Sequence, residues 1–269
     1  MTGILGRSAE SVAVALRGVF AAERVAARDG FLQRRDPRVS LCSITGLALA
    51  VVIARTLPVT VAIGLVTVAL ARLSAVPLWR LVARSAVVTL ASAVVVLPQV
   101  VLLPGEPVAR GLGLAVTDAG VAYVLTFTAR VGVGVALLSL LALTTPFSAI
   151  VAALRALRVP VALVWVVAVT YRYLFLFFAE LRRLVLARNS RTAGGSTARD
   201  GWRDARRIAG AFLLRALDRG ERVGRGMRAR GGARPPSPYE RSRALDRHDY
   251  ALAALAVAVV VGSGVVRWT

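Results

Sequence analysis

The sequence Tyr171-Arg172-Tyr173-Leu174-Phe175-Leu176-Phe177-Phe178 opens the stretch that decides the fold of this chain. This apolar aromatic run soon turns basic, and after a linker of small residues a second basic segment ends in Met227-Arg228-Ala229-Arg230-Gly231. The rest of the chain is dominated by apolar runs of about 20 residues, the length that spans a membrane. A long charged insert between such runs has to project into water, where a soluble partner can bind it.

Composition places the chain among helical membrane proteins. Hydrophobic residues make up 57% of its 269 residues, and several segments lack the polar face that a helix of a soluble protein needs. The fold class expected is therefore all-α: a polytopic membrane protein with about five transmembrane helices and a cytoplasmic domain of amphipathic helices.

The charge of the chain is strongly positive and is carried by arginine. The formal net charge is +21, and the sequence contains no lysine. Because positive residues favour the cytoplasmic side, most of this charge is expected there, at the cell membrane. Anionic lipid and acidic protein surfaces are then better partners than nucleic acid. The lone Cys42 and lone His248 predict neither a disulfide framework nor a metal site.

Hydropathy and turn signals predict four spans, then a polar domain, then a fifth span. The cytoplasmic N-terminal segment, residues 1–38, contains an amphipathic helix over about 8–28 or a partly ordered tail. Residues 39–144 hold the first four spans, 145–247 the cytoplasmic domain, and 248–269 the last span and the C-terminus. The expected spans are about 39–54, a segment ending near Leu78, 81–103, 119–143 and 250–266.

Residues 161–180 pose the main problem of topology. They are apolar enough to cross, but residues 181–247 then lie outside with 18 arginines and 6 acidic residues, a net charge of +12. That density argues against export, so this helix is expected to enter the membrane boundary without crossing. Arg172 and Glu180 fit a helix buried against protein. The cytoplasmic domain is predicted to contain three helices, about 146–158, 161–192 and 203–230.

Arginines at the ends of the two basic helices are the candidate binding residues. Arg188 and Arg191 are three apart, on one side of a helix, so they can enter one acidic pocket together. Arg230 lies at a helix end beside two glycines. The planar guanidinium makes paired hydrogen bonds to carboxylates. Composition alone equally allows interfacial helices whose arginines only touch lipid phosphates.

The residues also resemble those of a known family. The runs Leu141–Phe147 and Leu154–Pro160 look like the transmembrane T component of energy-coupling factor transporters, the CbiQ/EcfT family. So do Thr170–Phe175 and Ala187–Arg191, then Leu214–Leu217 with Ala229–Gly231, and Asp36-Pro37-Arg38 before the first span. The resemblance covers about residues 34–232. It departs at Thr192, where the family often has glycine after the first arginine motif.

This resemblance implies a coupling role for the cytoplasmic domain. T components bridge a substrate-binding membrane subunit, the S component, to two cytoplasmic ABC-type ATPases, which bind the ATP. This chain is then expected to hold no cofactor, no metal and no catalytic residue. The residues implied to contact the ATPases are Ala187, Arg188, Arg191, Ala229, Arg230 and Gly231, and Arg172 and Glu180 are candidates for a structural or coupling role. The relatives it most resembles serve cobalt or nickel uptake, and others serve vitamins.

Two rival functions are weaker. An intramembrane enzyme of lipid or prenyl transfer needs aspartate clusters that hold Mg²⁺, and here the aspartates are scattered among arginines. A conventional ABC permease presents a single coupling loop rather than two arginine-tipped helices. The chain cannot be the ATPase itself, because it has no lysine for a phosphate loop.

The predicted topology can be tested by cysteine labelling in intact cells. With Cys42 replaced by serine, single cysteines at Ser196 and Ser237 should resist an impermeant thiol reagent, because both lie in the basic domain. A cysteine at Thr269 should be labelled. Labelling at Ser196 from outside would contradict the five-span topology.

Overall fold

The computed structural model describes residues 30–54, 56–111, 114–191, 198–231 and 245–265. The chain forms two compact units, one of Ala22–Ala153 with Arg241–Thr269 and the other of Met1–Ala21 with Leu154–Glu240. The expected N-terminal helix over 8–28 lies outside the described residues. The elements are η1 Leu32–Arg34, α2 Pro37–Ile53, α3 Leu57–Leu73, α4 Leu78–Val96, α5 Gln99–Leu102, β1 Pro107–Gly111, β2 Leu114–Thr117, α6 Asp118–Thr144, α7 Phe147–Ala156, α8 Val161–Arg191, α9 Ala198–Ala229 and α10 Arg247–Val265.

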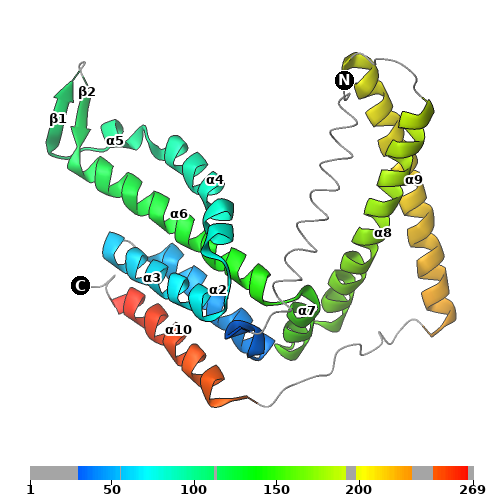
Figure 1. The fold of residues 1–269 in the computed structure, drawn as a ribbon, viewed down its shortest axis with the longest axis horizontal. Helices are drawn as coiled ribbons and strands as arrows, with labels where there is room; N and C mark the ends of the chain where they lie inside the picture. The colour runs from blue at the N-terminus through cyan, green and yellow to red at the C-terminus, as the bar shows by residue number, and fades with distance from the viewer. Residues whose placement is uncertain (1–29, 55, 112–113, 192–197, 232–244, 266–269) are drawn as a thin grey trace. The chain divides into compact units, whose positions relative to one another are not determined.

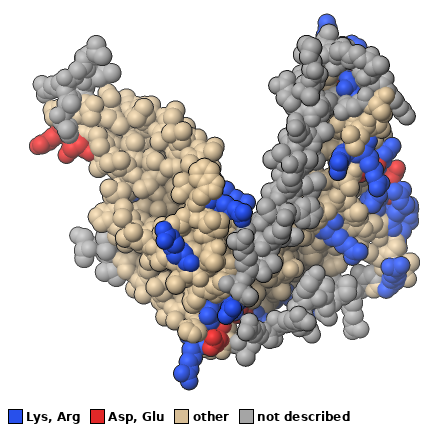
Figure 2. Space-filling model, in the orientation of Figure 1, with Lys and Arg blue, Asp and Glu red and all other residues tan. Residues whose placement is uncertain are grey.

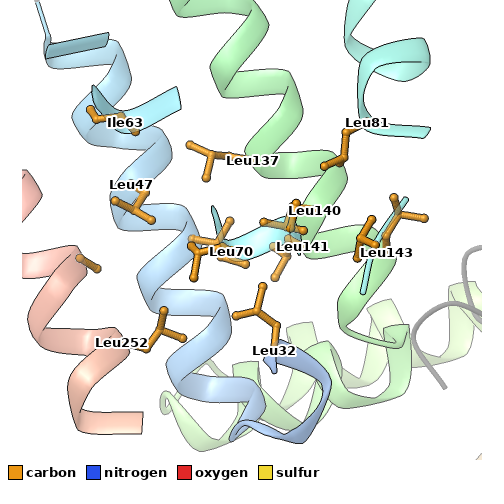
Figure 3. Close-up of a cluster of buried hydrophobic side chains, with 14 of the residues drawn as sticks. Leu32, Leu47, Ile63, Leu70, Leu81, Leu137, Leu140, Leu141, Leu143 and Leu252 are labelled. Atoms are coloured by element: carbon orange, nitrogen blue, oxygen red, sulfur yellow. The ribbon is translucent and has the colours of Figure 1, made fainter. Parts of the chain in front are cut away.

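Helix α6 is the axis of the first unit (Figure 1). It packs against α2, α3, α4 and α5, while α10 packs against α2. The core where these helices meet is aliphatic: Leu47 of α2, Leu137 and Leu140 of α6 and Leu252 of α10 belong to one buried cluster (Figure 3). With 27 residues, α6 is about 40 Å long and reaches past the ends of the 17-residue helices α2 and α3.

Two glycines allow other elements to approach α6 closely. A Cβ at Gly120 would lie 2.6 Å from the carbonyl oxygen of Val100, and one at Gly132 would lie 3.0 Å from Oγ1 of Thr89. Gly132 is one of the small residues in α6 that suit close helix packing, and it fills that role here. Gly134, two residues later, would suit the same role by its size, but nothing lies within 4 Å of its Cβ position.

The N-termini of α2 and α6 are capped by the side chains that the sequence offers. Asp36 accepts a hydrogen bond from the backbone N–H of Arg38 at 2.8 Å, with Pro37 in the first helical position. Thr117 caps α6 through the N–H of Gly120 at 3.2 Å. The sequence Thr145-Pro146 is typical of a helix start, but Thr145 is the C-cap residue of α6, since its N–H donates to the carbonyl of Leu141.

A buried carboxylate joins the start of α10 to the start of α2. Asp249 is 3% exposed. Its Oδ1 accepts from the N–H of Asp36 at 3.4 Å, and its Oδ2 accepts from the N–H of Asp246 at 2.9 Å. The guanidinium of Arg35 lies 4.0 Å from Asp249 and stacks over the ring of Phe31. One carboxylate therefore satisfies two backbone donors from segments more than 200 residues apart in sequence.

Asp246, just before α10, completes this group at the surface. Its carboxylate accepts from Nη1 of Arg35 at 3.2 Å. The pKa of Asp246 lies below the ordinary value because the N–H of Arg247 donates to it, with the nearby charges of Arg35 and His248 reinforcing the effect and desolvation opposing it. The depressed pKa means that its stabilising contribution is present above the ordinary pKa and is lost as the pH falls through the lowered one.

Arg130 lies midway along α6 and faces the end of another helix of the unit. The sequence predicts that such an arginine must face protein or water. Its Nη2 donates to the carbonyl of Ala54, the C-cap residue of α2, where a positive charge complements the helix dipole. Its Nε is buried without a hydrogen-bond partner among the described residues.

Two local features depart from the expected helices and loops. Pro98 interrupts the predicted span 81–103 between α4 and α5, because it supplies no N–H to the helix. The segment after it begins with the turn signal Pro104-Gly105-Glu106-Pro107, which predicts a loop. In the structure it forms an antiparallel hairpin in which Arg110 pairs with Ala115 and Gly111 with Leu114. Pairing of the strands satisfies backbone groups that a bare loop leaves to solvent.

The structure confirms an all-α polytopic membrane protein. Among the described residues, three helical segments are long and apolar enough to cross a membrane: Leu78–Leu102, which comprises α4 and α5, Asp118–Thr144 and Val161–Arg188. Helices α2 and α3 are shorter apolar helices at the positions of the first two expected spans, and α10 occupies that of the last. The number of crossings and the path of residues 161–180 remain predictions.

Replacing Asp249 by alanine should weaken the attachment of α10. The change leaves two backbone N–H groups without an acceptor, which costs about 1–3 kcal/mol, so the thermal unfolding midpoint of the purified protein should fall. Asp246→Ala is the matched control, with a side chain 61% exposed against 4% for Asp249. A larger loss for Asp246→Ala would contradict this account of the junction.

Candidate functional site

The second unit is built on two long helices, α8 and α9. Helix α8 starts directly after Pro160, whose carbonyl accepts from the N–H groups of Leu163 and Val164, and its first half is apolar. Helix α9 is amphipathic. It begins at Ala198, about one turn before the predicted start at 202–203.

Apolar residues at a spacing of about 3.6 predict one apolar face for α9, and this is its less exposed face. All five positions are partly buried: Ile208, Phe212, Ala216, Val223 and Met227. The ring of Phe212 packs edge-on against Phe177 of α8, with centroids 5.7 Å apart and planes at 79°. This aromatic contact joins the two helices at the point where α8 changes from apolar to basic.

Two ion pairs also join α8 to α9. Arg215 of α9 binds Glu180 of α8. Arg188 of α8 donates from Nε and from Nη2 to Oδ2 of Asp204, at 3.0 and 2.6 Å. Glu180 precedes Arg188 in α8, whereas its partner Arg215 follows Asp204, the partner of Arg188, in α9. The two helices are therefore antiparallel where they touch.

The first arginine motif therefore faces the neighbouring helix. Arg188 is partly buried against α9, its side chain 18% exposed, whereas Ala187 is exposed and accepts from Oγ of Ser190 at 3.0 Å. Arg191 is the last residue of α8, and its side chain lies outside the described part. The hypothesis that Arg188 and Arg191 enter one pocket together remains a prediction.

The second arginine motif ends α9 and is exposed. The N–H of Arg230 donates to the carbonyl of Met227, and that of Gly231 to the carbonyl of Arg228, each at 3.1 Å. Gly231 has a φ of +85°, the left-handed conformation that ends a helix and that glycine adopts without strain. Ala229, Arg230 and Gly231 are all exposed, so this motif is accessible in the described unit.

Arg172 and Glu180, the two polar residues expected to face protein, differ in their surroundings. Glu180 is partly buried and paired with Arg215 across the helix contact. Arg172 is exposed in the described unit. Only Glu180 is thus placed against protein within this chain.

Comparison with known proteins fixes the family. The family model described as "CbiQ: Cobalt transport protein" matches residues 29–239. The chain belongs to this family. It is 25% identical over 208 residues to an uncharacterized protein of Methanocaldococcus jannaschii, covering 75% of this chain and 71% of the relative. It is 37% identical over 90 residues to a protein of Rhodobacter capsulatus named cobalt transport protein CbiQ, covering 34% and 36%.

Membership of the CbiQ family makes this chain a membrane component of a transport system, and the match includes all of α8 and α9. Arginine side chains are concentrated on these helices, whereas most of the visible surface of the first unit carries no charged side chain (Figure 2). Many large apolar side chains of the first unit are exposed. No group of three or more histidine, cysteine, aspartate or glutamate side chains that could hold a metal ion occurs among the described residues.

The sequence did not predict that Asp204 is the partner of Arg188. It is one of few acidic residues in a basic helix, and it lies 3.9 Å from Arg207 one turn later as well as against Arg188. An isolated acid on the apolar-facing side of a basic helix could have been read as a cross-helix partner. The sequence alone could not identify Arg188 as the partner of Asp204, because that depends on where α8 and α9 touch.

The aromatic contact between the helices can be tested with neighbouring residues. Phe212→Ala should lower the unfolding free energy of the purified protein by about 1–2 kcal/mol, since a half-buried ring loses its packing. Leu213→Ala removes a side chain that is 59% exposed and should change it by less than about 0.5 kcal/mol. Equal losses would mean that Phe212 does not anchor α9 to α8.

Proposed function

We propose that this chain is the transmembrane coupling subunit of an energy-coupling factor importer. In this role it links ATP hydrolysis by two cytoplasmic ABC-type ATPases to a substrate-binding membrane subunit. The observation that carries the proposal is the exposed Ala229-Arg230-Gly231 end of α9, which lies within the family match on a helix packed against α8.

The chemistry of the arginines suits a groove of carboxylates. The guanidinium of Arg230 is exposed at the end of a long helix, where a partner surface can close around it. Its planar fork makes two charge-assisted hydrogen bonds to one carboxylate. The glycine that follows has no side chain to hold the partner away from this arginine.

The contacts between α8 and α9 supply a means of transmission. A displacement of α9 imposed at Arg230 is passed to α8 through Phe177 with Phe212 and through Glu180 with Arg215. The apolar first half of α8 then carries the movement into the lipid-embedded part of the molecule. This route is mechanical, so the chain itself needs no catalytic residue and no ATP site.

The proposal places the basic domain in the cytoplasm of a multi-pass cell-membrane protein. The positive-inside rule supports this orientation, and the ATPases that the proposal requires are cytoplasmic.

For the cargo we propose cobalt or nickel, supported by the description of the family and by the name of the Rhodobacter capsulatus relative. Isolation of the tagged full-length chain should recover two ATPases and a small membrane protein.

Charge reversal at the end of α9 should abolish transport. Arg230→Glu should lower cobalt or nickel uptake more than about tenfold, because a carboxylate in the partner groove loses its cation and faces a like charge. Arg230→Lys should restore uptake only in part, since lysine lacks the paired geometry. The measurement is metal uptake in cells that contain equal amounts of each variant in the membrane.

The matched control reverses the charge of two other exposed arginines of α9. Arg206→Glu with Arg222→Glu changes the total charge by twice as much but lies away from the helix end. If the arginines only bind lipid phosphates, the loss of metal uptake should follow the total charge that is changed. The double variant should then lose more uptake than Arg230→Glu. Uptake lost equally or more in this control would contradict a specific role for Arg230.

A further inference from the structure

The arginine of the first motif is already bound to a carboxylate of its own chain. Arg188 donates two hydrogen bonds to Oδ2 of Asp204, and neither side chain is fully buried, at 18% and 24% exposure. An arginine expected to bind carboxylates of a partner thus lies against an aspartate of its own chain.

We propose that Asp204 binds Arg188 in the free subunit, and that a carboxylate of the ATPase replaces Asp204 as the partner of Arg188 when the ATPase binds. In the free subunit Asp204 holds the guanidinium of Arg188 against α9. When an ATPase presents its own carboxylate, Arg188 leaves Asp204 and binds the partner. This inference rests on the proposed coupling function and adds to it a step that regulates assembly.

The surroundings of Asp204 make the exchange feasible. A part-buried carboxylate that loses its cation is costly, but Nη1 of Arg207 lies 3.9 Å from Oδ1 of Asp204 on the same helix. Arg207 is 75% exposed and its side chain can move to take the place of Arg188. Asp204 therefore keeps a positive neighbour when Arg188 departs.

The exchange also leaves the helix pair intact. The ring contact of Phe177 with Phe212 and the ion pair of Glu180 with Arg215 lie farther along the interface, toward the membrane-inserted half of α8. Arg188 lies near the other end, three residues before the helix stops at Arg191. One ion pair at the end of an antiparallel contact can open while the others still join the helices.

The experiment measures the dissociation constant between full-length variants in detergent and the ATPase pair that co-purifies with the wild-type chain. Asp204→Asn should tighten binding about threefold to tenfold, because Arg188 no longer has to leave a charged partner. Asp218→Asn is the matched control: it makes the same charge change at an exposed position of the same helix, and binding should stay within about twofold. Arg188→Ala should weaken binding.

The outcomes separate this inference from the proposed function. If Arg188→Ala binds the ATPase pair with wild-type affinity, Arg188 does not make the ATPase contact that the proposed function requires. If Arg188→Ala weakens binding while Asp204→Asn binds no better than Asp218→Asn, the contact stands and the exchange is overturned.

A double variant in which the two charges are exchanged controls for misfolding of the single variants. Arg188→Asp with Asp204→Arg keeps an ion pair between α8 and α9, so its thermal unfolding midpoint should exceed that of Arg188→Asp alone. Its ATPase binding should remain weak, because the position that meets the partner now carries a carboxylate. Wild-type binding by the swapped protein would overturn the exchange.

Discussion

Repulsion among arginines is the constraint on which the basic domain depends. Helices α8 and α9 carry many arginines and few acids, so they would separate unless specific contacts offset the repulsion. The ring pair of Phe177 and Phe212 supplies apolar contact, and Glu180 and Asp204 each neutralise an arginine of the opposite helix. Glu180 and Asp204 are thus placed where the helices touch, whereas Asp218 and Glu221 are exposed on α9.

The unit built around α6 meets the opposite constraint, because there polar groups are scarce and apolar surface is plentiful. Its aliphatic core joins α2, α3, α6 and α10, and several of its polar contacts lie at helix ends. Asp36 and Asp249 satisfy backbone donors at one end of α2, and Arg130 satisfies a carbonyl at the other. In an apolar surrounding an unpaired backbone group is costly, so these few residues determine where the helices begin and end.

The sequence was enough to predict the helices but not how they pair. Runs of apolar residues and the prolines at 37 and 160 placed the boundaries of α2, α6 and α8 within a few residues of those observed. The period of Ile208, Phe212 and Ala216 predicted the packed face of α9. Asp204 was missed because its role depends on the crossing of α8 and α9, which no local pattern contains. The strand pairing after Pro98 likewise depends on two short segments meeting, and neither is distinctive alone.

The central claim is that the end of α9 contacts an ATPase, and site-specific photocrosslinking tests it most directly. A photoreactive amino acid would be placed at Ala229 in the full-length chain in cells, with Leu213, exposed on the same helix, as the comparison position. The account predicts that position 229 crosslinks to an ABC-type ATPase and that position 213 does so far less. Crosslinking to the ATPase from position 213 but not from 229, or to lipid alone from 229, would contradict it.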